Sequence, residues 1–320
     1  MSATRRARVR ALAKINLDLR VLGKRPDGFH ELRTIFQTIS LGDRLDIAFT
    51  PARRTSIALD DKLQIANNLC VRAARVVMDA MRATGRIEMR LTKRIPMGAG
   101  LGGGSSDAAA VLLALPILAG RALALPKLSD IAQQLGSDVP FFLLGGTAVG
   151  IGRGAELFPL PDMASQAGLL IAPAIHVDTA QAYRDLSPHV TGGLTSGLTT
   201  ELQQNKIFSF QSLTWDPGSL GLARNDFEAV VFEQHPKLAT LKRRLVRAGA
   251  AAALMSGSGS AVYGLFSDRN AIFHAIESLG EERTFRFSLV SRSRYRALWR
   301  RAMADHTKSA VWPLQSRYTV

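Results

Sequence analysis

Apolar and polar residues alternate through much of the first fifty positions, which is the pattern of strands buried on one face. Four stretches carry this pattern, at 8–13, 15–23, 34–39 and 44–49. Between the second and the third stretch, residues 26–28 read Pro-Asp-Gly, which is typical turn chemistry. The chain is therefore expected to begin as a β-meander.

Beyond these strands, apolar residues recur at helical spacing. Helices are expected at 68–84, 106–115, 129–135, 226–232, 237–248 and 270–279. Further strands are expected at 87–91, 168–173, 261–266 and 284–291. Because strands and helices occur in both halves of the chain, the pattern predicts a mixed α+β protein.

The length of 320 residues predicts two domains, since a typical domain holds roughly 150. The stretch at 158–166 has two prolines and no periodicity, so it is the best linker between a domain at 1–160 and a domain at 161–303. The final residues, 304–320, lack a period and include Pro313. They are expected to form an irregular, loosely attached tail with no catalytic role.

Composition excludes several classes of protein. The single cysteine, Cys70, can form neither an internal disulfide nor a thiolate metal cluster, which favours a reducing, cytoplasmic location. The longest apolar runs, at 108–120 and 139–151, fall short of the roughly 20 residues that a bilayer crossing needs. No membrane partner is expected.

The net charge of +15 is concentrated at the two ends of the chain. Residues 1–33 and 283–320 carry nine Lys and Arg each, against three acidic residues in the first and one in the second. A nucleic-acid-binding face would instead show a basic stripe with interleaved aromatics inside a folded domain. The distribution favours solvated basic ends and an anionic small-molecule site near the N-terminus. Nucleic-acid binding through these ends is the alternative from a different class.

A glycine-rich segment directly before a predicted helix is the strongest candidate for chemistry. It consists of Pro96, Met97, Gly98, Ala99, Gly100, Leu101, Gly102, Gly103, Gly104, Ser105 and Ser106. Dense glycines let backbone N–H groups converge on one point, and the helix N-terminus adds a positive dipole end, so the segment suits phosphates. It has neither the Gly-Lys-Ser/Thr of a Walker loop nor the later acidic residue of a dinucleotide fingerprint. The alternative is a structural hinge or a packing turn.

Three shorter segments place polar residues beside apolar ones. Lys14 and Asn16 share one face of a predicted strand, and Asp138 lies between a helix end and an apolar run. A Gly/Ser loop at 255–261 leads into a strand. Taken alone, each has an ordinary explanation: an edge lysine kept for solubility, a helix-cap acid and a turn.

Together these segments resemble the GHMP kinases, a superfamily that includes galactokinase, homoserine kinase and mevalonate kinase. The segment at 96–106 is similar to their phosphate-binding motif, and the resemblance runs from about residue 9 to 291. It implies a two-domain α+β fold. The N-terminal domain would be a ribosomal-protein-S5-like α/β domain, and the C-terminal domain a ferredoxin-like α/β domain.

Further motifs resemble one branch of that superfamily, the kinases of cytidine-diphospho-methylerythritol. They are Ala-Lys-Ile-Asn-Leu at 13–17, Arg-Pro-Asp-Gly-Phe-His-Glu-Leu at 25–32, Asn-Leu-Cys-Val-Arg-Ala-Ala at 68–74, Gly-Ser-Asp-Val-Pro-Phe-Phe at 136–142, Asn-Asp-Phe-Glu at 225–228 and Met-Ser-Gly-Ser-Gly-Ser at 255–260. The resemblance implies transfer of the ATP γ-phosphoryl group to the 2-hydroxyl of 4-diphosphocytidyl-2-C-methyl-D-erythritol, in the non-mevalonate route to isoprenoid precursors. Phe29 departs from the Tyr of several members, which removes a phenol hydrogen bond and leaves stacking. The tail after about residue 303 matches nothing in the family.

By the same resemblance, Asp138 would act as general base with Lys14 beside it. The glycine-rich segment would wrap the phosphates of ATP, with Mg²⁺ accompanying the nucleotide and no protein ligand of the metal singled out. Residues of the substrate pocket would be Asn16, Phe29, His30 and Tyr183. His30 would read the edge of the cytosine, and the two aromatic rings would enclose its faces.

A monomer or weak homodimer is expected. The nearest rival is another GHMP kinase, acting on mevalonate or homoserine. Such an enzyme has the glycine-rich segment but no need of Phe29, His30 and Tyr183 around a nucleobase.

Overall fold

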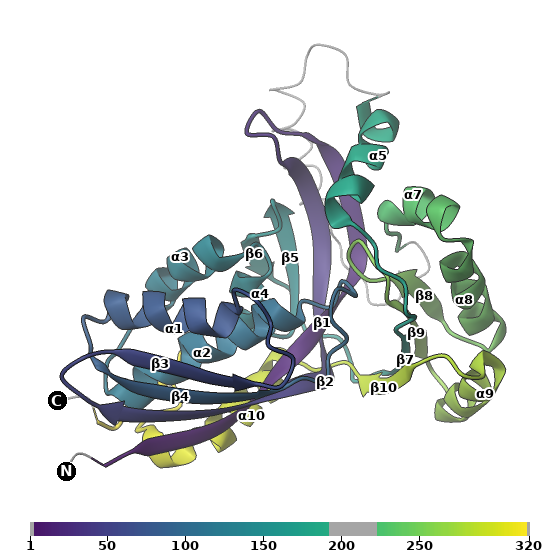
Figure 1. Cartoon of the computed structure of the whole chain (residues 1–320). Coiled ribbons are helices and arrows are strands. Elements are labelled where there is room, and N and C mark those ends of the chain that lie inside the picture. The colour runs from purple at the N-terminus through teal and green to yellow at the C-terminus, as the bar shows by residue number, and fades with distance from the viewer. Residues whose placement is uncertain (1–2, 192–222, 319–320) are drawn as a thin grey trace.

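Two β-sheets, each packed against helices, lie side by side in the molecule (Figure 1). The computed structural model describes residues 3–191 and 223–318, and for 187–191 only the backbone is described. The predicted two-domain α+β fold is confirmed.

The first sheet has the strand order β3-β4-β2-β5-β6, with β1 paired to β2. Its strands are β1 (Arg5–Lys24), β2 (His30–Pro51), β3 (Ser56–Asp61), β4 (Gly85–Thr92), β5 (Thr147–Gly152) and β6 (Glu156–Pro159). Every pair is antiparallel except β3 with β4.

Strands β1 and β2 form one long hairpin where the sequence predicts four separate strands. They pair along almost their whole length, up to Lys24 opposite His30. Register shifts on both sides of Lys14 and Asn16 are bulges, which let a strand bend and twist without ending. The outer half of the hairpin, which also pairs with β5, therefore bends away from β3 and β4 and runs beside the second domain (Figure 1).

Helix α2 (Gly103–Ala119) is the centre of the first domain. It is apolar on every side from Ala108 to Leu118, which is the pattern of a fully buried helix. It packs against β1 and β2 and against three other helices: α1 (Leu69–Ala80), α3 (Leu125–Leu135) and α4 (Val139–Leu144). None of the described helices has the length and apolarity that a membrane crossing requires.

The second sheet has the order β10-β7-β9-β8, and all its pairs are antiparallel. Its strands are β7 (Ala167–Ile171), β8 (Ala252–Met255), β9 (Val262–Phe266) and β10 (Thr284–Ser288). The helices of this domain are α5 (Thr179–Thr191), α7 (Phe227–Gln234), α8 (Pro236–Arg247) and α9 (Arg269–Leu279). The β-α-β-β-α-β sequence with spatial order four-one-three-two is the predicted ferredoxin-like arrangement.

The apolar run at 139–151 divides into two elements that its sequence pattern does not separate. Gly145 and Gly146 have φ of +66° and +76°, a conformation that favours glycine, and they end α4 and lead into β5. A run that is buried on all sides shows neither helical nor strand periodicity. The predicted linker at 158–166 begins inside β6, the last strand of the first sheet.

The C-terminal segment returns to the first domain, which corrects the predicted boundary at 303. Helix α10 (Arg292–Ala302) places Tyr295 and Trp299 in the same hydrophobic core as α2. Met303 and Leu314 join that core. The domain formed around the second sheet therefore ends near β10, because the apolar face of α10 packs against β1.

The tail is tightly held, so the prediction of loose attachment is wrong. The indole N–H of Trp312 donates to the carbonyl of Leu143 (2.9 Å), and the buried Ser316 hydroxyl donates to the carbonyl of Ile117 (2.7 Å). The imidazole of His306 lies within hydrogen-bond distance of the Arg6 carbonyl (2.8 Å) and the Tyr318 hydroxyl (2.9 Å). Additional polar contacts with the first domain thus offset the ordering entropy that the few apolar residues alone would not.

Truncation after Met303 is expected to lower the free energy of unfolding by about 2–5 kcal/mol, the range for losing one large buried side chain with its contacts. Urea unfolding of the truncated and full chains measures this difference. At temperatures where both chains are folded, kcat and both KM values should stay within about two-fold, because no tail residue up to Tyr318 lines the two cavities beside the glycine-rich segment at 96–106. A chain ending at Tyr318 is the control. Equal stability of the two truncated chains would contradict the docking.

Candidate active site

A cavity of about 900 Å³ lies where the two domains meet. Its wall includes Lys14 from β1, Asp138 at the start of α4, Phe29 and His30 from the turn of the long hairpin, and Tyr183 from α5. The structure therefore brings the predicted catalytic residues and the predicted nucleobase residues into one cavity.

A second cavity, of about 410 Å³, lies on the other side of the glycine-rich segment. It is lined by residues 65–69, by Lys93 and by the segment from Pro96 to Ser105. Gly98, Gly100 and Gly102 line both cavities. Two molecules bound in the two cavities would thus approach each other across these glycines.

The backbone of the glycine-rich segment needs glycine for two reasons. Gly98, Gly100 and Gly102 have φ between +65° and +73°, which side chains other than glycine rarely adopt. A Cβ on Gly100 would lie 2.0 Å from the carbonyl oxygen of Ser256. Gly102 is also the N-cap of α2, so the free N–H groups of the helix start face the segment that both cavities share.

The two serines of the predicted phosphate-binding segment have different surroundings. The Ser106 hydroxyl donates to the carbonyl of Leu12 (2.7 Å), and its N–H donates to the carbonyl of Gly102 (2.8 Å). Ser106 is buried and does not line the second cavity, whereas Ser105 does. Ser106 therefore anchors α2 to β1, and Ser105 is the serine that lines the second cavity.

The apolar members of the motif contribute backbone rather than side chains. Ala99 and Leu101 are buried in the core between the domains. The carbonyl of Leu101 accepts from the N–H of Lys14 (3.1 Å), and the carbonyl of Ala99 accepts from the N–H of Ala261 (3.3 Å). These contacts fix the segment against β1 on one side and the second domain on the other.

Lys14 and Asp138 form an ion pair with Nζ and Oδ2 3.4 Å apart. The side chain of Lys14 is only 4% exposed, and that of Asp138 is 32% exposed. The ammonium is thus held inside the protein while the carboxylate reaches the open cavity. A substrate hydroxyl can approach the carboxylate directly.

Asn16 fixes the position of the Lys14 ammonium. Its Oδ1 accepts from Lys14 Nζ (2.7 Å) and from the N–H of Gly257 (2.9 Å), and its Nδ2 donates to the hydroxyl of Thr34 (2.7 Å). Asn16 lines the same cavity as the other residues predicted for the substrate pocket. Its polar contacts join β1 to β2 and to the loop at 255–261 of the second domain.

The aromatic residues gather around the far end of the cavity. Tyr183 stacks on His30 with ring centroids 4.7 Å apart, and its edge meets Phe227. Phe29 is 52% exposed, and the Arg153 guanidinium lies 4.3 Å from its ring centroid. Burial and the nearby Lys24 ammonium lower the pKa of His30, which favours a neutral imidazole able both to donate and to accept.

Sequence reasoning missed several basic residues of this cavity. His176 and the cationic side chains of Lys24, Arg153 and Arg184 line it beside the predicted residues. Each occurs in an unremarkable sequence context, and only the fold brings them together. Their charges suit an anionic group between the aromatic end and Lys14.

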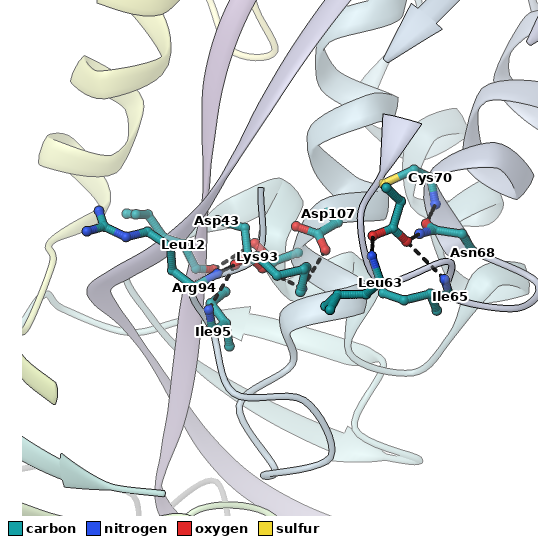
Figure 2. A network of polar contacts seen from close by, with 12 residues as sticks. Leu12, Asp43, Leu63, Ile65, Asn68, Cys70, Lys93, Arg94, Ile95 and Asp107 are labelled. Carbon is teal, nitrogen blue, oxygen red and sulfur yellow. Dashed lines mark hydrogen bonds and ion pairs between the residues drawn. The ribbon is translucent and has the colours of Figure 1, made fainter. Parts of the chain in front are cut away.

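Two polar networks hold the walls of the second cavity (Figure 2). In the first, Lys93 Nζ lies 2.5 Å from an oxygen of Asp43 and 2.7 Å from an oxygen of Asp107. In the second, Asp61 accepts from the backbone N–H of residues 63 and 65 and from the side chain of Asn68. The networks fix the chain at 93–95 and the loop at 62–68.

Comparison with known proteins identifies the family. The model for the N-terminal domain of GHMP kinases matches residues 68–146, and the model for their C-terminal domain matches 215–282. A 4-diphosphocytidyl-2-C-methyl-D-erythritol kinase of Solibacter usitatus is 80% identical over 318 residues, covering 99% of both chains. The chain belongs to the 4-diphosphocytidyl-2-C-methyl-D-erythritol kinase family of the GHMP kinases.

More distant relatives agree with this family. A 4-diphosphocytidyl-2-C-methyl-D-erythritol kinase of Pelotomaculum thermopropionicum is 40% identical over 81% of this chain and 88% of its own length. A crystal structure of 4-(cytidine 5'-diphospho)-2C-methyl-D-erythritol kinase is 35% identical, covers 88% of this chain and 98% of its own, and has a TM-score of 0.71. Homoserine kinase from Cytophaga hutchinsonii, at 18% identity and a TM-score of 0.66 over 89% and 95% of the two chains, supports the fold alone. The predicted family and the prediction of a small-molecule kinase are confirmed.

Gly104→Val is expected to weaken ATP binding strongly while the protein stays folded. Gly104 lines the second cavity, and a Cβ there would meet only Leu69 at an ordinary 3.6 Å. At Gly103 a Cβ would lie 3.0 Å from Ile95 and 3.2 Å from Lys93 Nζ, so a valine there would also disturb the core. Isothermal titration with ATP measures the effect, and thermal unfolding is the control. Unchanged ATP affinity in a folded Gly104→Val variant would place the phosphates elsewhere.

Proposed function

We propose that this kinase transfers the γ-phosphoryl group of ATP to the 2-hydroxyl of 4-diphosphocytidyl-2-C-methyl-D-erythritol. The observation that carries the proposal is the Lys14–Asp138 pair, placed in a cavity that shares the glycine-rich segment with a second cavity. The names of the relatives, which are kinases of this compound, support the choice of substrate.

Asp138 would act as the general base of the reaction. Its carboxylate is partly exposed to the cavity and can accept the proton of the substrate hydroxyl. The Lys14 ammonium, 3.4 Å away, stabilises the negative charge that develops on the hydroxyl oxygen as the proton leaves. Asn16 holds that ammonium in place, so its charge needs no reorganisation during the reaction.

ATP would occupy the second cavity, with its phosphates against the segment from Gly98 to Ser105 and the N-terminus of α2. No group of three or more His, Cys, Asp or Glu side chains within the described residues is arranged to hold a metal ion. Ser105 lines this cavity, and its hydroxyl would lie near a Mg²⁺ ion that arrives with the phosphates. When bound, that ion neutralises phosphate charge during transfer.

The cytidine end of the substrate would lie among Phe29, His30 and Tyr183. The exposed ring of Phe29 offers a face for stacking, and the neutral imidazole of His30 offers a donor and an acceptor to the base edge. The Tyr183 ring stacks on the His30 ring, so the two side chains together would form the wall at this end of the cavity. Lys24 and Arg153 supply positive charge for the diphosphate.

A coupled assay of ADP release tests the substrate. The cytidine-diphospho compound should be turned over, and mevalonate, homoserine and galactose should not. None of these three has a base to occupy the aromatic end. Turnover of mevalonate or homoserine in preference to the cytidine compound would overturn the proposal.

The proposal includes a cytoplasmic location, a monomer or weak homodimer, and no nucleic-acid or membrane partner. Cys70, the single cysteine, is buried, and burial raises the pKa of its thiol, which keeps it unreactive. A single thiol with no second cysteine in the chain to form a disulfide is typical of proteins in a reducing compartment.

Asp138→Asn should lower kcat by roughly two to four orders of magnitude, the usual contribution of general acid–base catalysis. The amide keeps the shape of the carboxylate and cannot take the proton. Steady-state kinetics and ATP titration check this, with ATP binding retained. Activity of Asp138→Asn within a few-fold of the parent would show that Asp138 is not the general base.

Lys14→Ala should also lower kcat, because the charge of Lys14 is needed as the hydroxyl loses its proton. The same steady-state kinetics measure this, and a change in KM alone would assign Lys14 to binding.

Phe29→Ala should raise KM for the cytidine substrate about ten-fold or more, since stacking is worth on the order of 1–3 kcal/mol per base. KM for ATP should stay nearly unchanged. Phe29→Tyr keeps the ring and is the matched control. Tyr183→Ala is a less clean test, because Tyr183 also packs against Phe227 and its loss affects the fold. Equal rises of both KM values in Phe29→Ala would mean that the ring does not read the base.

A further inference from the structure

The Thr34 hydroxyl belongs to a chain of buried hydrogen bonds that starts at Lys14, and the proposed reaction assigns it no role. Thr34 lies on β2 and Asn16 on β1, and both are buried. Asn16 is opposite Phe36 in the register, so Thr34, two residues before Phe36, is its diagonal neighbour on the same face of the hairpin. The strand pairing therefore places the amide beside the hydroxyl, with Asn16 Nδ2 and Thr34 Oγ1 2.7 Å apart.

Chemistry fixes which atom donates at each step of this chain. The Lys14 ammonium and the backbone N–H of Gly257 can only donate, so the Asn16 amide turns Oδ1 toward them, at 2.7 and 2.9 Å. The other end of the amide, Nδ2, donates to Thr34 Oγ1. The Thr34 hydroxyl in turn donates to the carbonyl of Asp18 (2.8 Å), which can only accept.

A β-bulge lies at the last step of the chain. The register of β1 against β2 shifts between Asn16 and Asp18, so Leu17 is the extra residue of β1. Bulges re-aim the groups beside them, and the carbonyl of Asp18 here accepts from a side chain of β2. The proton of the Thr34 hydroxyl is thus committed to the backbone, and its oxygen is left to accept from Asn16.

The position of the Lys14 ammonium depends on this amide. Lys14 Nζ is buried, and its shortest polar contact in the described part of the chain is Asn16 Oδ1, whereas the Asp138 carboxylate is 3.4 Å away. The acceptor is neutral, so it orients the ammonium without cancelling its charge. A buried amide nitrogen without an acceptor is costly. Without the Thr34 hydroxyl the amide would therefore shift toward another acceptor, and Oδ1 would move away from Lys14.

We propose that Thr34 is a positioning residue for phosphoryl transfer: its hydroxyl sets the orientation of the Asn16 amide and, through it, the place of the Lys14 ammonium. The inference rests on the proposed roles of Lys14 and Asp138 in the reaction. Thr34 lies in the wall of the larger cavity but is only 2% exposed. Its hydroxyl therefore acts through Asn16 and does not touch the reacting atoms.

Thr34→Val is the central test, because valine has nearly the shape of threonine and lacks the hydroxyl. The value of kcat should fall roughly 10- to 100-fold, the effect of displacing a catalytic group by about an ångström. KM for ATP and for the cytidine substrate should stay within about three-fold, because an interaction with the bound ground state is not removed. Steady-state kinetics measure both. An unchanged kcat overturns the inference, and a higher KM for the cytidine substrate in that case would place the hydroxyl against the substrate.

Two further variants separate positioning from a general loss of stability. Thr34→Ser keeps the hydroxyl and should retain kcat within about three-fold. Thr147→Val removes another buried threonine hydroxyl of the same sheet, which donates to Gln37 Oε1 (2.7 Å) and lines neither cavity of the site. It should lower the unfolding temperature about as much as Thr34→Val and leave kcat within about two-fold. An equal fall of kcat in Thr147→Val would mean that the rate follows stability, which overturns the inference.

A double-mutant cycle tests whether Thr34 acts through Asn16. In an Asn16→Ala background, Thr34→Val should change kcat by less than about two-fold, because the amide that the hydroxyl orients is gone. Losses that add in the double variant would show independent actions and overturn the inference. If Thr34→Val does not fold, as judged by thermal unfolding, Thr34→Ala carries the same expectations, since it places no methyl group against the amide.

The same kinetics distinguish this inference from the proposed function. If Lys14→Ala and Asp138→Asn lower kcat while Thr34→Val does not, the inference fails and the proposed function stands. If none of the three variants lowers kcat, both fail.

Discussion

The close approach of two backbone segments, the glycine-rich segment and the loop at 256–259, joins the two domains and shapes both cavities. Gly100 meets Ser256 so closely that no side chain fits between them, and the Ser256 hydroxyl donates to the Gly100 carbonyl at 2.9 Å. Asn225 donates to the carbonyls of Met255 and Gly257 and so holds the loop from behind. The N–H of Gly257, aimed by this arrangement, then binds Asn16.

The position of the Lys14 ammonium therefore depends on both domains at once. Lys14 belongs to the first sheet, its acceptor Asn16 is bonded to the second domain, and Asp138 starts a helix elsewhere in the first domain. A shift between the domains would move the ammonium relative to the carboxylate. Bulges beside Lys14 and Asn16 let the strand follow this contact without losing its pairing with β2.

Local chemistry explains which features the sequence could predict. The glycine-rich segment, Lys14, Asn16 and Asp138 stand out because glycine density and isolated polar residues in apolar surroundings are local signals. The Asp43–Lys93–Asp107 cluster is not predictable in this way, because each member is an ordinary charged residue and only the fold brings the three together. The same holds for Arg153, which gains its place beside Phe29 from the pairing of β2 with β5.

The errors at the C-terminus have a related cause. The tail has few apolar residues, a proline and no helical or strand periodicity. Its own side chains therefore suggest too little burial to offset the entropy lost on ordering the backbone. The partners of this tail are backbone carbonyls of the first domain, among them those of Arg6 and Ile117, and no pattern in the tail marks them. Helix α10 was likewise not predicted from the sequence. Its many arginines suggest a solvated segment, whereas Tyr295 and Trp299 form a buried face.

The two clusters of acidic and basic residues beside the glycine-rich segment differ in their access to solvent. The Asp138 side chain is 32% exposed and reaches the larger cavity, whereas the Asp107 side chain is only 3% exposed and is held within the protein by Lys93. Removing Lys93 would leave two buried carboxyl groups without their cation, a strongly destabilising change of about 3–5 kcal/mol in comparable cases. The Lys93 cluster thus supports the fold as well as the site.

The length of the hairpin matches the shape of an elongated substrate. Asn16 lies opposite Phe36 and Lys24 opposite His30, so six residues of β2 separate the level of Asn16 from the aromatic end of the cavity. At about 3.3 Å per residue this is roughly 20 Å along an extended strand. A molecule with a hydroxyl at one end, a diphosphate in its middle and a base at the other can contact Lys14, the cationic side chains and the aromatic rings together. A short hydroxy acid would be held at one end only, and its binding energy could not contribute to orienting the hydroxyl.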